Sequence, residues 1–268
     1  QHFCLVSPRH LVTLAIVDAK FARIAWFQVV DLETGKRFEH HRQLPNARVS
    51  IARSLWDERT SYEAAGFRIA IHNHLDAGEH LIDVGIVARR GLPAVRASWR
   101  CAHDLAAIEP LVVSMPVGLD RCAYSHKVPL PVAGTLEVGG AVDTWREDSC
   151  TAILDIHKGH YPRHTFWKWA TFAGRGDNGS RVAVNLTKNV VDDDVTYNEN
   201  AIWLDGKVTK LGPALFEFEP DHLMRPWRLR SACGAASLTF RPAGFRAENL
   251  SLPGLFRSRF HQLYGEFT

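Results

Sequence analysis

The sequence lacks the features that mark a membrane-spanning helix or a nucleotide-dependent enzyme. No apolar run reaches the ~18 residues that a helix needs to cross a bilayer. There is no GxxxxGK phosphate loop, no GxGxxG that opens a helix, and no GxSxG nucleophile elbow. We therefore expect a protein without stable membrane insertion that needs no cofactor.

Cysteine pairs at metal-binding spacing are also missing. The five cysteines are odd in number and far apart, with no CxxC and no Cys/His pair at zinc spacing. This usage favours free thiols in a reducing compartment, so we expect a cytoplasmic protein without a metal centre.

Excess charge of one sign is absent as well. The net charge is only +3 and the arginines are scattered, so we expect no nucleic-acid partner. A hydrophobic content of 46% with 23% charged residues is typical of a globular chain with a sizeable core.

Short β-branched and aromatic runs separated by Gly and Pro predict an all-β fold. Residues 31–36, Gly139-Gly140 and Asp205-Gly206 are expected hairpin turns. The expected strands include residues 11–17, 21–30, 67–72, 81–88, 108–115, 135–138, 141–144, 152–156, 165–172, 181–186, 201–204, 207–211, 215–218, 227–230, 237–240 and 256–267.

So many short antiparallel strands must close on themselves or stack, because open edges invite aggregation. We expect two β-barrel or sandwich halves, residues 1–124 and 125–268, that meet near residues 122–131. A site would lie in a barrel mouth or at this junction.

Residues 148–200 combine aromatic and ionisable side chains, which a ligand pocket needs. Asp155, at the end of an apolar run, is the first catalytic candidate, with its pKa raised by an apolar pocket so that it donates a proton near neutral pH. The alternative is a structural aspartate in a turn. Glu199 is the second carboxylate, and His157 is a candidate partner in proton transfer.

Further side chains are candidates for ligand binding. Trp167 and Trp169 should point the same way from a strand and wall a pocket, although buried core tryptophans give the same pattern. The histidines at 157 and 160 lack a third ligand, so we predict no metal there. The remaining predicted ligand-binding residues are Lys127, His160, Asn185, Asn198 and Asn200.

Longer motifs resemble a known family. These are Ser125-His126-Lys127, Asp148-Ser149, Leu154-Asp155, Thr165-Phe166-Trp167-Lys168-Trp169-Ala170, Asn185-Leu186, Asn198-Glu199-Asn200 and Met224-Arg225-Pro226-Trp227-Arg228. Together they are similar to domain of unknown function 2804 over most of the chain. More distantly, Leu154-Asp155 and the aromatic segment resemble the carotenoid hydratase and tocopherol cyclase group. That resemblance implies a two-domain calycin-like (lipocalin-like) β architecture.

Three functions fit these residues. The first is proton transfer on an apolar isoprenoid or lipid-like substrate, giving hydration, isomerisation or cyclisation, with tryptophan faces favouring a transient carbocation. The second is a glycoside hydrolase that uses Asp155 and Glu199 on a sugar-containing ligand. The third is a lipid-binding protein with an apolar lumen and no chemistry. We favour the first.

Overall fold

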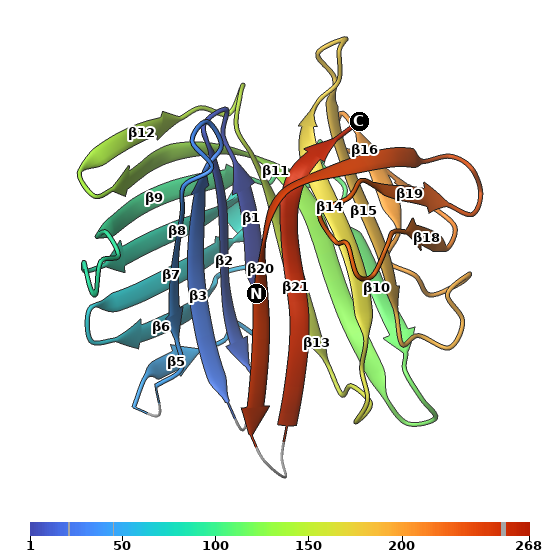
Figure 1. Ribbon diagram of the computed structural model, residues 1–268, viewed down its shortest axis with the longest axis horizontal. Coiled ribbons are helices and arrows are strands. Elements are labelled where there is room, and N and C mark those ends of the chain that lie inside the picture. Colours follow the sequence, from blue (N-terminus) through green and yellow to red (C-terminus); the bar gives the residue numbers. More distant parts are fainter. Residues whose placement is uncertain (21, 45, 253–255) are drawn as a thin grey trace.

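The computed structural model describes residues 1–20, 22–44, 46–252 and 256–268. It is built from antiparallel strands, and the helical part of these residues is a single 3-10 turn, η1 (Leu75–Ala77). The predicted all-β, calycin-like fold is confirmed, and the sheets are curled into half-barrels (Figure 1).

The strands of the first half come largely from the N-terminal part of the chain. They are β1 (His2–Val6), β2 (His10–Asp18), β3 (Arg23–Asp31), β4 (Arg37–Arg42), β5 (Arg48–Ser50), β6 (Glu58–Ala64), β7 (Phe67–His74), β8 (Glu79–Ile86), β9 (Val95–Ala102), β10 (Leu111–Pro116), β11 (Cys122–Val138), β12 (Ala141–Trp145) and β13 (Thr151–Gly159). They form a thirteen-stranded sheet in the order β4-β3-β2-β1-β13-β11-β9-β8-β7-β6-β5, with β10 and β12 also paired to β11.

The rest of the chain forms two four-stranded sheets. They consist of β14 (Trp167–Arg175), β15 (Arg181–Asn189), β16 (Ala201–Leu204) and β17 (Lys207–Lys210), followed by β18 (Ala214–Glu217), β19 (Trp227–Ser231), β20 (Ser237–Leu252) and β21 (Phe256–Phe267). One face of β15 packs towards β10 through Ala183, and the other packs towards β18–β21 through Val184 and Leu186.

Strand β11 connects the two halves and is far longer than the expected strand at residues 135–138. The strand contains Pro129 and Pro131, although proline cannot donate to a sheet ladder. In the structure β10 pairs with β11 up to Lys127 and β9 pairs with it only from Val132. The prolines lie in this gap, where neither β10 nor β9 pairs with that edge of β11, so a missing proline N–H costs no hydrogen bond on that edge. The predicted boundary between residues 124 and 125 falls within this shared strand.

The expected hairpin turns are present. Asp205 and Gly206 have positive φ angles of 47° and 86° and join β16 to β17, as a type I′ turn requires. Gly139 and Gly140 likewise join β11 to β12. The expected strand at residues 21–30 is β3, although Phe21 lies outside the described residues.

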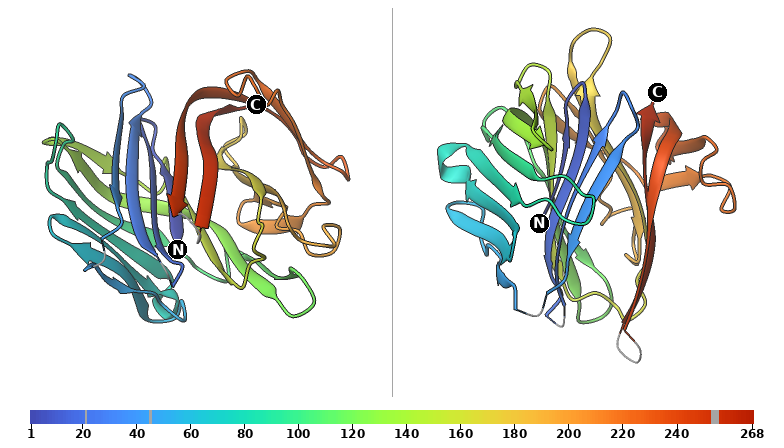
Figure 2. Two further views of the ribbon diagram at one scale, coloured as in Figure 1. Left: turned by 60° about the horizontal axis from the view of Figure 1, so that its bottom comes forward. Right: turned by 60° about the vertical axis from the view of Figure 1, so that its left-hand side comes forward.

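The first half has a large apolar core, smaller apolar clusters join β10 and β11 to the second half, and a polar contact lies between the halves as well. Phe3, Trp99 and Trp145 belong to the large apolar cluster that fills the first half. Arg246 on β20 is 96% buried, lies over the rings of Trp26 and Phe260, and pairs with Glu39 of β4 at 3.2 Å. This contact fastens the long C-terminal hairpin to the first half, beside which it runs in Figure 2.

A row of buried histidines lies inside the first half. His80 Nε2 is 3.0 Å from His103 Nδ1, and the rings of His103 and His126 are 6.4 Å apart. Burial lowers the pKa of His80 to about 3 and the pKa values of His103 and His126 to about 4. The rings are therefore neutral in the folded protein at neutral pH.

Acid is expected to destabilise the fold through these histidines. Their pKa values are lower in the folded than in the unfolded state, so between about pH 6.5 and 4 the unfolded chain binds more protons than the folded protein. The free energy of unfolding therefore decreases as the pH is lowered through this range. The variant His126→Gln should reduce the slope of unfolding free energy against pH by nearly one proton, about 1.4 kcal/mol per pH unit. Urea unfolding at several pH values measures this, and an unchanged slope would contradict it.

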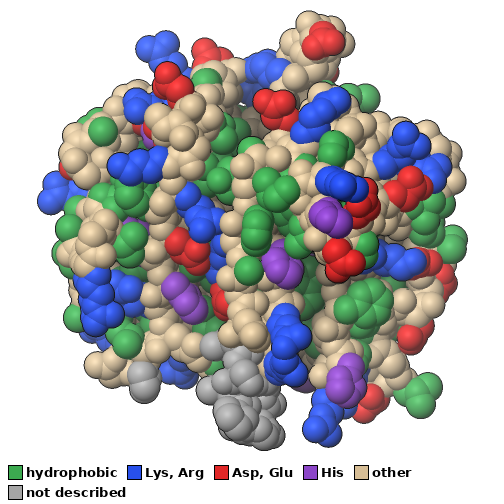
Figure 3. All heavy atoms as spheres, in the orientation of Figure 1, with side chains coloured by type: hydrophobic (Ala, Val, Ile, Leu, Met, Phe, Trp, Pro, Cys, Tyr) green, Lys and Arg blue, Asp and Glu red, His purple; other side chains and the backbone are tan. Residues whose placement is uncertain are grey.

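The surface mixes charges of both signs. Basic and acidic side chains are interspersed over the face drawn in Figure 3, as the small net charge predicts. All five cysteines are free thiols, which confirms that expectation. Within the described residues, no helix has the length and apolar character to cross a membrane.

Candidate functional site

The site lies at the junction of the two halves, where Lys127 on β11 is paired in register with Asp155 on β13. Side chains alternate along a strand, so His157 shares the face of these two residues. Strand β13 ends at Gly159, where the backbone of β11 comes very close. A Cβ at this position would lie 2.6 Å from the Cys122 carbonyl oxygen, so the close approach requires glycine. Local strand geometry thus gathers three ionisable groups.

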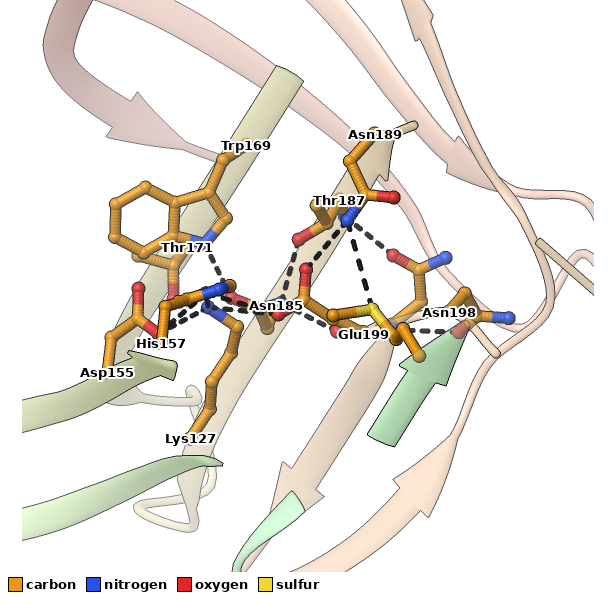
Figure 4. Close-up of polar contacts among 12 residues, drawn as sticks. Lys127, Asp155, His157, Trp169, Thr171, Asn185, Thr187, Asn189, Asn198 and Glu199 are labelled. Atoms are coloured by element: carbon orange, nitrogen blue, oxygen red, sulfur yellow. Dashed lines mark hydrogen bonds and ion pairs between the residues drawn. The ribbon is translucent and has the colours of Figure 1, made fainter. Parts of the chain in front are cut away.

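Four ionisable side chains converge at this point (Figure 4). Lys127 Nζ donates to Asp155 Oδ1 at 2.6 Å and lies 3.7 Å from Glu199 Oε1. His157 Nε2 is 3.2 Å from Asp155 Oδ1, from Glu199 Oε1 and from Lys127 Nζ. The lysine and both carboxylates are at least 92% buried, whereas 35% of the His157 side chain is exposed. The histidine is the member that meets solvent.

The sequence-based prediction for the ionisation of Asp155 is wrong. Burial acts to raise the pKa of Asp155, as expected for an apolar pocket, but the charges of Lys127 and His157 outweigh it and hold the pKa well below its usual range. Asp155 is therefore a carboxylate at neutral pH and has no proton to donate. The sequence could not show that Lys127 lies directly opposite.

Asparagines hold Glu199 in place from several sides. Asn189 Nδ2 donates to Glu199 Oε2 at 3.1 Å, and Asn185 Nδ2 donates to the Glu199 backbone oxygen at 2.6 Å. Asn200 Oδ1 accepts from the Thr187 backbone at 2.6 Å, and Asn198 Oδ1 accepts from the Asn200 backbone at 2.9 Å. The predicted ligand-binding asparagines are thus occupied with fixing the segment that carries Glu199.

The two tryptophans separate. Trp169 lies with its ring centroid 5.0 Å from Lys127 Nζ and donates through Nε1 to Asn185 at 2.6 Å. Trp167 is 50% exposed and lies near Phe260 of β21 instead. The expectation of a shared wall is therefore wrong, because Trp167 starts the strand at its exposed end. The cation over Trp169 is the protein's own lysine.

Histidine 160 is also outside the cluster. It is exposed just beyond β13, and its contact is a backbone hydrogen bond to Cys122. Tyr161, which sequence reasoning missed, has its hydroxyl 2.9 Å from His157 Nδ1. Burial and the charges of Glu199 and Asp155 raise the pKa of Tyr161, so its hydroxyl stays protonated. Its loop position gave no periodic signal.

Other missed residues follow the strand pattern. Ser125 is two residues from Lys127 on the same strand, pairs in register with His157, and is 99% buried. Thr187 and Asn189 alternate with Asn185 along β15. Once β11 and β15 are known as strands, this two-residue spacing points to all three.

The cluster contains nitrogen and oxygen donors, but it already holds a cation. Lys127 Nζ is within 3.7 Å of both carboxylates and so occupies the place that a metal ion would take between them. A crevice of about 30 Å³ between the halves is bordered by Pro129, Thr151 and Trp203, and none of the four cluster residues lines it. The cluster is an ion-pair network built around the protein's own lysine.

Comparison with solved structures shows the same fold. Kievitone hydratase from Nectria haematococca superposes with a TM-score of 0.54 at 10% identity, covering 94% of this chain and 78% of the hydratase. A protein provisionally named AttH from Nitrosomonas europaea gives a TM-score of 0.53 at 14% identity, covering 90% of this chain and 79% of the other. At these identities the likeness concerns the fold alone.

The sequence comparisons define the family. A search of curated proteins finds no match to this chain. The profile described as domain of unknown function 2804 matches residues 1–268, as the motifs suggested. The chain therefore belongs to the family of domain of unknown function 2804.

Proposed function

We propose that the protein is an enzyme that transfers protons to and from an apolar substrate, isoprenoid or lipid-like, in a hydration, isomerisation or cyclisation. His157 is the catalytic residue that meets the substrate. Asp155, Glu199 and Lys127 set its charge environment, and the reaction needs no cofactor.

One observation carries the proposal. The His157 side chain is 35% exposed, and its Nε2 lies 3.2 Å from two buried carboxylates and a buried ammonium group. One lysine and two carboxylates leave an excess of one negative charge, which a proton on His157 would neutralise. Histidine is the side chain whose ordinary pKa suits proton exchange near neutral pH.

The surroundings of His157 favour an apolar substrate. The segment that follows β13 carries Tyr161, Phe166 and Trp167, whose exposed fractions are 40%, 54% and 50%. Exposed aromatic side chains offer a large apolar contact area to a ligand. Tyr161 also contacts the ring of His157 directly. An apolar molecule lying against Tyr161 would be next to His157.

The chemistry of hydration fits this arrangement in two steps. The protonated imidazole gives its Nε2 proton to an alkene carbon, and water then adds to the neighbouring cationic carbon and loses a proton to the ring. The fold shared with kievitone hydratase supports the hydratase form. Asp155 and Glu199 converge on one nitrogen rather than flank a gap for water, so the geometry gives a glycoside hydrolase less support.

The test uses water labelled with oxygen-18. Apolar extracts of cells are incubated with the purified protein in labelled water, and products are read by mass spectrometry. We expect new species that carry the label with wild type and not with His157→Asn, while His261→Asn, an exposed histidine on β21, behaves as wild type. Isomerisation would appear instead as deuterium uptake in heavy water. Neither label entering any product would refute the proposal.

A further inference from the structure

A second cluster of ligating side chains lies on the outer face of the first half. Asp57 comes directly before β6, and His72 and His74 are two residues apart on β7. One ring nitrogen of each histidine and one carboxylate oxygen of Asp57 lie within 4.8 Å of one another. In Figure 1, β6 and β7 lie on the side of the molecule away from β14 and β15, so this cluster is distinct from the candidate site.

The distances match those of a metal site. His72 Nε2 is 3.3 Å and His74 Nδ1 is 3.1 Å from the same oxygen, Asp57 Oδ1. With metal–ligand bonds of about 2.0–2.1 Å, ligands at two corners of a tetrahedron are about 3.3 Å apart. Two of the three separations therefore already have the length expected between ligands of one ion, and the two histidine nitrogens lie within 4.8 Å of each other. A fourth position would face solvent.

The backbone holds the three ligands in this arrangement. Ile71 and Asn73 point into the protein, so the alternation of β7 turns both histidines outward. Hydrogen bonds from the Leu75 and Asp76 amides to the Leu55 and Trp56 carbonyls fasten the segment before Asp57 to the end of β7. Little rearrangement is then needed on binding.

Neighbouring charges do not occupy the site. Arg59 is paired with His72 across β6, but its guanidinium points to Glu63 at 3.5 Å. Glu79 is paired with His74 across β8 and binds Arg100 at 2.5 Å. The charged side chains paired in register with the two histidines are thus both engaged elsewhere.

We propose that Asp57, His72 and His74 form a surface site for Zn²⁺ or a similar first-row divalent ion. Two imidazoles and a carboxylate are a donor set that such ions accept. The ion ties the segment before β6 to β7.

Titration of the metal-free full chain with zinc chloride tests this proposal. Calorimetry should show one ion per chain. His72→Ala, His74→Ala and Asp57→Asn should each weaken binding by at least the roughly 10–100-fold that loss of a supporting group costs at metal sites. Circular dichroism checks that each variant is folded.

Two controls locate the ion. His261→Ala and His157→Asn should bind zinc as wild type does, and cobalt should give the visible spectrum of a four-coordinate ion in both. Binding that persists unchanged in all three ligand variants, or that is lost in His157→Asn, would overturn the assignment. So would the absence of stoichiometric binding to the wild type.

Discussion

Replacing Asp155 by asparagine is expected to lower the free energy of unfolding by about 3–5 kcal/mol, because it leaves the buried Lys127 ammonium without its closest counter-ion. Glu199 is 3.7 Å from the same nitrogen and compensates only in part. Urea denaturation at neutral pH measures the change. Asparagine has nearly the same shape as aspartate, so the loss of stability measures the effect of removing the negative charge.

A double-mutant cycle separates the ion pair from packing. Lys127→Met combined with Asp155→Asn removes both charges and should cost much less than the sum of the single changes. Glu109→Gln breaks the exposed pair with Lys207 and should change stability little. Additive single-variant effects would show that Lys127 and Asp155 do not depend on one another.

The same residue predicts a response to acid. The pKa of Asp155 is depressed in the folded state, so its contribution is fully present above its unfolded pKa of about 3.9 and is lost as pH falls from there towards the folded pKa. The variant lacks this contribution at any pH. The stability difference between wild type and Asp155→Asn should therefore shrink below pH 4.

Local patterns predicted many of the strands but missed others, such as β6 and β9, and did not show how far each one extends. Two-residue turns such as Asp205-Gly206 can be predicted from the sequence, because only certain residues readily adopt a positive φ. Pro129 and Pro131 argue for a strand end, and only the three-dimensional pairing reveals the gap that accommodates them. Strand continuity in β11 is thus a tertiary property.

The candidate site was predicted in composition but not in arrangement. Asp155, His157 and Glu199 were identified, and they do converge with Lys127. Their roles depend on contacts between positions that are far apart in the sequence. Lys127 and Asp155, for example, are 28 residues apart. Apolar neighbours in the sequence predicted a neutral acid, whereas the lysine across the strand makes it a carboxylate. The pattern of residues along one strand does not show which residue of another strand lies opposite.

His157→Asn is expected to abolish most turnover while leaving the fold intact. A positioned acid or base contributes ~10²–10⁴-fold to a rate, and asparagine cannot exchange a proton at the position of Nε2. The side chain is 35% exposed, so its replacement leaves the buried lysine and carboxylates in mutual contact. Initial rates with the labelled-water assay and melting temperatures are measured on the same samples. Tyr161→Phe serves as the matched variant, since it removes only the hydroxyl that contacts Nδ1 and should cost far less. Full turnover per folded His157→Asn molecule would exclude the histidine and transfer the proton-transfer role to Glu199.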